Sequence, residues 1–183
     1  MCGMQRKPCS VLLPNQPLQR TGLRPAAERQ NRWADGPGSL SSDDYDDPAL
    51  EARWLAQQRG NVERYLETES VRHGGVDADC SWYVAPYVSV WIVRSLARLG
   101  SVGWWAISGD LPTDYLSGGD ATDARSALRA FARRWREVAE YMYRGEDHPD
   151  MSVGNPENKT ELGGLLRRRA EIIQEFVSDD SLW

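Results

Sequence analysis

A segment of strand-forming residues that is apolar on both faces constrains the fold of this chain most. Residues 82–108 are rich in Val, Ile, Tyr and Trp, which favour strands, and a hairpin-type connection at 96–101 separates strands over 82–93 and 102–108. In the first strand, one face carries Tyr87, Ser89, Trp91 and Val93, and the opposite face carries Val88, Val90 and Ile92. In the second strand, one face carries Val102, Trp104 and Ala106, and the opposite face carries Gly103, Trp105 and Ile107. We expect Pro86 at the start or edge of its strand, because it would interrupt a central ladder. A two-stranded hairpin of this kind is stable only when other elements cover it.

Three segments with helical periodicity are available as cover. The first begins at Asp47, which caps free amides, and Pro48, which needs no amide donor; it ends before His73. The second ends near Gly145, and the third begins at Thr160. The apolar positions of the first segment are Leu50, Trp54, Leu55, Val62, Tyr65 and Leu66. Those of the second are Leu128, Phe131, Trp135, Val138 and Met142, and those of the third are Leu162, Leu165, Leu166, Ile172, Ile173, Phe176 and Val177. The order α-β-β-α-α predicts a small α+β domain in which an antiparallel hairpin packs against helices.

Residues 1–42 differ in composition from the rest of the chain. They hold five of the ten prolines and show no sustained period, so they bury too little apolar surface to offset the entropy of ordering. We interpret them as a disordered leader and residues 43–183 as a single domain. The stretch PNQPLQRTGLRPAAERQ also resembles translated repeat elements at the ends of unrelated bacterial proteins, which implies a segment foreign to the native protein. A tail that binds a partner is the alternative.

The net charge of −5 is distributed unevenly. Residues 1–42 carry six basic and two acidic side chains, which leaves a net charge of −9 on residues 43–183. An acidic domain disfavours nucleic acid, because affinity for it depends on neutralising phosphates. The charge suits a basic protein partner instead.

The three cysteines argue against a disulfide-stabilised secreted fold, because their number is odd and their spacing forms no framework. Cys2 and Cys9 have no histidine near them, so we expect no metal site there. No apolar run approaches the length of a membrane span, and the run at residues 10–14 is too short for a signal peptide. We therefore expect a cytoplasmic protein without membrane contact and without a cofactor.

The stretch GWWAISGDLPTDYLSGGD, residues 103–120, is the strongest candidate for a site. Asp110 and Asp114 follow the second strand, and two carboxylates at a strand end are able to bind a cation or share acid–base chemistry. In the alternative, Asp110 caps a turn at Pro112, and Thr113 or Asp114 caps a short helical turn. The spacing matches no strong metal motif, which favours the structural role.

No potential nucleophile lies in a strong catalytic motif, and we predict no catalytic residue from such a motif. Ser108 precedes Gly109 without the glycine pattern of a nucleophile elbow. Cys80 and His73 are separated by a flexible Gly-Gly pair, and no third group to orient them is evident. We interpret Cys80 as buried or incidental, and His148, in a polar loop, as a surface residue.

Aromatic side chains around the hairpin outnumber what one packed face needs. Most are expected in the core, and the others are available to line a groove. Trp and Tyr beside acidic groups suit the binding of a protein or a cationic ligand. The predicted binding residues are Trp104, Trp105, Ser108, Asp110, Thr113, Asp114 and Tyr115.

Three blocks of the chain resemble a bacterial family, domain of unknown function 4826. They are WYVAPYVSVWIVRS, GWWAISGDLPTDYL and ARSALRAFARRWREVAEYM, at residues 82–95, 103–116 and 124–142. The resemblance covers residues 46–183 and implies a small stand-alone protein. It brings no assigned activity, no established cofactor and no catalytic residue to transfer.

Two functions remain open from the sequence, besides a purely structural fragment of a larger assembly. The first is a non-catalytic interaction protein that meets a protein partner through an acidic, aromatic-rimmed surface centred on residues 108–115; an immunity-like protein that neutralises a basic partner is one form of it. The second is a small hydrolase-type or metal-assisted enzyme that uses Asp110 and Asp114. The partner or substrate and the oligomeric state stay open.

Overall fold

The computed structural model describes residues 9–11, 45, 47–149, 151–153 and 158–183. The prediction that residues 1–42 form a disordered leader therefore lies outside the described residues, apart from residues 9–11. These form β1 (Cys9–Val11), which pairs in parallel with β6 (Met151–Val153). The pairing places this part of the leader beside the segment that precedes the last helix.

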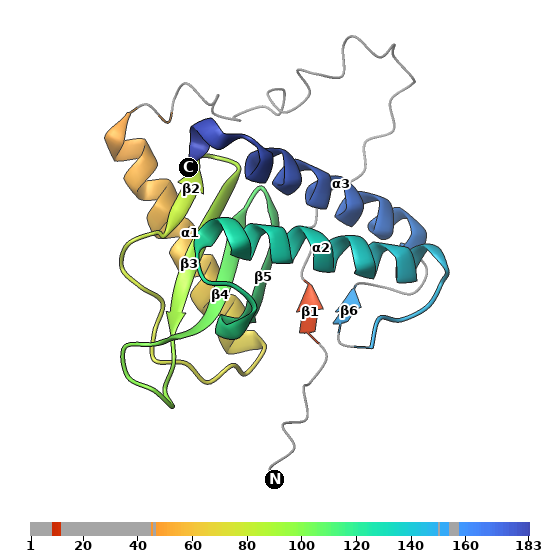
Figure 1. Ribbon diagram of the computed structural model, residues 1–183, viewed down its shortest axis with the longest axis horizontal. Helices are drawn as coiled ribbons and strands as arrows, with labels where there is room; N and C mark the ends of the chain where they lie inside the picture. The colour runs from red at the N-terminus through yellow and green to blue at the C-terminus, as the bar shows by residue number, and fades with distance from the viewer. Residues whose placement is uncertain (1–8, 12–44, 46, 150, 154–157) are drawn as a thin grey trace.

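The predicted hairpin is the centre of a larger antiparallel sheet with the strand order β2-β3-β4-β5 (Figure 1). Its strands are β2 (Trp82–Val84), β3 (Val88–Arg94), β4 (Val102–Gly109) and β5 (Leu111–Ser117). Pro86 lies in a turn that divides the first predicted strand into β2 and β3. The predicted helical turn at Thr113 or Asp114 is wrong, because both residues belong to β5, which pairs with β4. Pro112 is compatible with this pairing because β5 is an edge strand.

Helices cover both faces of the sheet, as the apolar pattern of its strands requires (Figure 1). α1 (Pro48–Thr68) lies on one face, and α2 (Ala124–Tyr143) and α3 (Lys159–Ser178) lie side by side on the other. Asp47 accepts a hydrogen bond from the amide of Ala49 at 2.8 Å, which confirms the predicted start of α1. Short 3-10 turns, η3 (Gly118–Asp120) and η5 (Asp180–Leu182), follow β5 and α3. The α+β class and the order α-β-β-α-α are confirmed.

Two apolar cores lie on opposite faces of the sheet, and the alternation along the strands divides their side chains nearly as predicted. The core beneath α2 and α3 includes Val88, Val90, Trp105, Ile107 and Leu116; the core beneath α1 includes Val62, Leu66, Trp91, Val93 and Ala106. Tyr87 and Val102 differ from the prediction, since both pack against the first of these cores. Tyr87 lies in the turn before β3 and therefore outside the alternation of the strand. Val102 changes sides because of a bulge at Gly103, where the register with β3 shifts between Val93 and Arg94.

The predicted apolar stripe of α2 is confirmed. All five of its residues are buried, and the most exposed of them, Met142, is only 3% exposed. α3 packs closely against this helix, because a Cβ atom at Gly163 would lie 3.0 Å from the Cβ of Met142. The predicted stripe of α3 is wrong at Leu165, which is 47% exposed. None of the helices in the described part of the chain has the length and apolarity that a membrane span needs.

A capping box starts α2. The Asp123 carboxylate accepts from the amide of Ser126 at 2.7 Å, and the Ser126 hydroxyl accepts from the amide of Asp123 at 3.1 Å. The bond from the Ser126 amide is the main cause that holds the pKa of the Asp123 carboxyl below its ordinary value. This cap fixes where α2 begins and therefore how its stripe meets the sheet.

Replacing Asp123 by alanine is expected to lower the free energy of unfolding by about 1 kcal/mol at neutral pH. The pKa of Asp123 is lower in the folded than in the unfolded protein. Its carboxylate therefore makes its full contribution to the free energy of unfolding above the unfolded pKa. This contribution is lost as the pH falls through the lower, folded pKa. Urea denaturation of both proteins from neutral to acid pH measures the difference, and a difference that stays constant with pH would contradict this role.

Candidate functional site

A tight corner between β4 and β5 carries the predicted acidic residue Asp110. Its amide donates to the carbonyl of Tyr87 at 2.9 Å, which joins this corner to the turn before β3. The preceding residue, Gly109, has a φ of +152°, and a Cβ atom there would lie 2.2 Å from the same carbonyl oxygen. Only glycine fits this close approach. Backbone geometry therefore sets Tyr87 and Asp110 beside each other.

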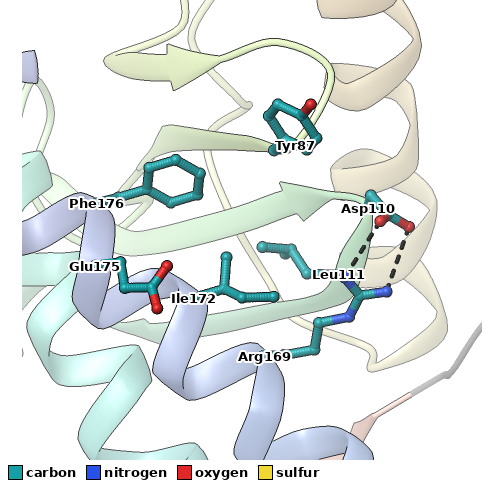
Figure 2. Close-up of a pocket in the computed structure, with 7 residues that line it drawn as sticks. All are labelled: Tyr87, Asp110, Leu111, Arg169, Ile172, Glu175 and Phe176. Carbon is teal, nitrogen blue, oxygen red and sulfur yellow. Dashed lines mark hydrogen bonds and ion pairs between the residues drawn. The ribbon is translucent and has the colours of Figure 1, made fainter. Parts of the chain in front are cut away.

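A pocket of about 210 Å³ opens between this corner and α3. Figure 2 shows Leu111 and Ile172 at its floor and Phe176 and Tyr87 on its flank. Arg169, Ile172 and Phe176 reach it because residues three and four positions apart lie on the same side of a helix. The complete lining is Tyr87, Asp110, Leu111, Arg169, Ile172, Glu175 and Phe176.

The rim of this pocket is charged and predominantly acidic. Arg169 donates to both carboxylate oxygens of Asp110, at 3.2 and 3.5 Å, and the ion pair is half-exposed (Figure 2). Glu175 is exposed, and its carboxylate has no hydrogen bond or ion pair with any residue that the structure describes. Among the described residues, the Glu175 carboxylate is therefore unpaired and lies beside an apolar floor.

Asp114, the second predicted carboxylate, lies away from this pocket. It is 0% exposed and accepts from the indole of Trp135 and from the amide of Tyr115, each at 2.8 Å. Arg134 lies 3.9 Å from it and donates to the carbonyl of Tyr115 at 2.9 Å. Asp114 thus joins edge strand β5 to α2, and the structure does not bring the two carboxylates into one cavity.

The sheet separates the other predicted binding residues. Ser108 lies on the α1 side, where its hydroxyl donates to the Oε1 of Gln58 at 2.9 Å and lies 3.3 Å from that of Thr113. Tyr115 meets Tyr65 of α1 with ring centroids 6.1 Å apart. The remaining two predicted residues are Trp104, which packs against the α1-side core, and Trp105, which is buried on the other side.

Alternation along the strands is the reason that the seven predicted residues do not form one surface. Successive side chains of a strand point to opposite faces of the sheet. Of the seven, only Asp110 lines the pocket. The predicted surface centred on residues 108–115 is therefore not continuous.

A wider cavity of about 620 Å³ lies at the start of α2, with Trp105 and Arg129 in its wall. The chain's own contacts occupy its aromatic side, because Trp82 and Trp183 stack with ring centroids 4.5 Å apart. Arg125 is engaged as well, since it donates to the carbonyl of Val177 at 2.8 Å. The pocket beside α3 is the better candidate for a ligand.

Sequence reasoning missed the contribution of α3 to the pocket. The periodicity of α3 predicts Ile172 and Phe176 on a buried stripe, and Arg169 and Glu175 belong to no motif. One signal was present: the predicted stripe of α3 holds seven apolar residues, which is more than one packed face needs. A surplus of this kind indicates apolar side chains that face a groove.

The potential nucleophiles are in unreactive surroundings. Burial raises the pKa of the Cys80 thiol to about 11, so it stays protonated at neutral pH. His73 accepts from the amide of Gly75 at 3.1 Å, and Ser108 is fully buried. In the described ranges, no group of three or more His, Cys, Asp and Glu side chains is placed to hold a metal ion.

The family described as Domain of unknown function (DUF4826) matches residues 48–183. The chain belongs to this family. The resemblance seen in its sequence blocks is thereby confirmed. No curated protein and no solved structure matches the chain. The DUF4826 region includes the four-stranded sheet, the three helices and every residue that lines the pocket.

Proposed function

We propose that this DUF4826 protein is a non-catalytic binding protein whose pocket beside α3 receives an apolar side chain next to a positive charge on a protein partner. The observation that carries the proposal is the Glu175 carboxylate, which no described residue pairs with, beside the apolar floor of Leu111 and Ile172. Apolar burial supplies affinity, and a carboxylate at the rim selects a basic neighbour over an acidic one.

The geometry supports binding better than the enzyme alternative. Catalysis by Asp110 and Asp114 together needs both carboxylates at one substrate, but Asp114 is buried under Trp135. Asp110 lies at the pocket, where its charge is already paired with Arg169.

The composition of the chain favours a basic partner and a cytoplasmic location. The net charge of −9 on residues 43–183 suits a basic partner, such as one that an immunity-type protein neutralises. Three cysteines without a disulfide framework favour the cytoplasm, where thiols stay reduced.

Selection of phage-displayed random peptides against the immobilised protein tests this function. We expect enrichment of peptides in which an aliphatic or aromatic residue adjoins Arg or Lys. Replacing Ile172 by glutamate puts a charge on the pocket floor, and enriched peptides are expected to bind that variant at least about tenfold more weakly. Replacing Glu175 by glutamine is expected to reduce the preference for basic over neutral peptides.

Leu165→Glu is the matched control, because Leu165 is exposed on the same helix and does not line the pocket. It is expected to bind the enriched peptides like the wild type. Circular dichroism of all variants checks that they are folded. Enrichment of acidic peptides, or equal binding by the Ile172→Glu and Leu165→Glu variants, would exclude the proposed function.

A further inference from the structure

The tip of the β3–β4 hairpin exposes two leucines at the end of the sheet. Leu99 is 94% exposed and Leu96 is 55% exposed. Arg98 lies between them in sequence, and its side chain has no partner among the residues that the structure describes. Two exposed leucines on one hairpin tip give a partner an apolar surface to cover, with a positive charge beside it.

Hydrogen bonds hold this tip in one conformation. The Ser95 hydroxyl accepts from the amides of Ala97 and Arg98, at 3.2 and 3.3 Å. The carbonyl of Arg98 accepts from the hydroxyl of Ser101 at 2.7 Å, and Arg94 donates to the carbonyl of Gly100 at 3.1 Å. A loop that is ordered before it binds loses less entropy on docking. The leucines are therefore presented in advance of any contact.

The tip has the features that the pocket beside α3 is proposed to bind. It offers aliphatic side chains next to the positive charge of Arg98, and the pocket offers an aliphatic floor next to the carboxylate of Glu175; neither charge is paired within the described part of the chain. We infer that the β3–β4 tip of one copy of this chain inserts into the pocket of a second copy. Leu99 contacts the floor of that pocket, and Arg98 pairs with Glu175. The inference rests on the proposed function of the pocket, and the positive charge it uses is the local one of Arg98, because the whole chain carries a net charge of −5.

The two surfaces cannot meet within one molecule. Tyr87 and Asp110 lie where β3 begins and β4 ends, and the tip lies at the opposite end of both strands (Figure 1). β3 has seven residues, so the two ends are separated by about 20 Å along the strand. Because the contact joins two unlike surfaces, a pair of copies still has one free tip and one free pocket. Further copies are able to add there and form chains or closed rings. The contact is small, so we expect association to be weak and to increase with concentration.

Sedimentation velocity of two single variants and their mixture tests the inference. Leu99→Glu puts a charge on the tip, which then no longer fits an apolar floor, and leaves the pocket unchanged. Ile172→Glu puts a charge on the pocket floor and leaves the tip unchanged. The wild type is expected to show a weight-average mass that rises with concentration, while each variant alone stays monomeric. An equimolar mixture of the variants is expected to form a dimer and no larger species. Leu165→Glu is expected to associate like the wild type.

Three results would overturn the inference: a wild type that stays monomeric up to millimolar concentration, a mixture that stays monomeric, or a Leu99→Glu variant that associates like the wild type. The proposed function survives each of them if the Ile172→Glu variant still loses binding of the selected peptides. It fails separately if that peptide binding is unchanged.

Discussion

Replacing Trp135 by alanine is expected to cost more stability than any other single change considered for α2. The ring is 0% exposed, and removing a buried tryptophan side chain costs about 3–5 kcal/mol. The change also removes the indole donor to the buried carboxylate of Asp114, which adds about 1–3 kcal/mol. Urea denaturation monitored by circular dichroism measures the sum.

A phenylalanine at position 135 keeps an aromatic ring in the core and removes the indole donor together with part of the ring volume. We expect a loss of about 1–3 kcal/mol, smaller than for alanine. This variant also keeps the test informative if the alanine variant does not fold. Unchanged stability of both variants would show that Trp135 neither fills the core nor supports Asp114.

Replacing Gly109 by alanine is expected to destabilise the protein and to open the corner at the pocket. The new Cβ would lie 2.2 Å from the carbonyl oxygen of Tyr87, at a φ of +152° that side chains rarely adopt. The backbone must therefore move, at a cost of about 3 kcal/mol or more from strain and overpacking together. The same movement breaks the bond from the amide of Asp110 to Tyr87. Thermal denaturation measures the loss.

Gly119→Ala is the matched control for this substitution. The nearest atom to its added Cβ is the Ser117 hydroxyl oxygen at 3.7 Å, which is an ordinary contact, and its φ lies outside the strained range. We expect it to melt close to the wild type. Equal melting of the Gly109 and Gly119 variants would mean that the close approach to Tyr87 is not required.

The sequence was sufficient to predict the helices and the faces of the central strands, because both depend on local periodicity. The stripe from Leu128 to Met142 repeats at three- and four-residue steps, and all of it is buried. Val90 and Trp91 face opposite cores, as alternation requires. Tyr87 and Val102 were exceptions, because a turn ends the alternation before β3 and a bulge depends on pairing with another strand.

β5 was missed because local composition argued against a strand. Pro112 and two aspartates favour turns, yet contacts distant in sequence determine the conformation of this segment. Leu111 and Leu116 are buried beneath the helices, and the Asp114 carboxylate accepts a hydrogen bond from Trp135 of α2 and lies 3.9 Å from Arg134. A pattern within the segment cannot report those partners.

The candidate site was predicted only at Asp110 for a similar reason. The pocket arises where α3 crosses the β4–β5 corner, and Arg169 is 59 residues from Asp110 along the chain. Periodicity places Ile172 and Phe176 on the buried face of α3, but it does not show that the two side chains line a pocket. The separation of Ser108 and Asp110 also depends on the register shift between Ile107 and Gly109, which the sequence does not reveal.

Titration of the ¹⁵N-labelled protein with two small molecules of similar shape and opposite charge tests the central claim most directly. Isopentylamine and isovalerate carry the same branched apolar group, and only the amine is positively charged. We predict that the amine shifts the backbone amide signals of Tyr87, Leu111 and Ile172 and that isovalerate does not. Equal shifts with both molecules, or shifts confined to the cavity around Trp105 and Arg129, would contradict the assignment of the pocket beside α3 as an acidic-rimmed binding site.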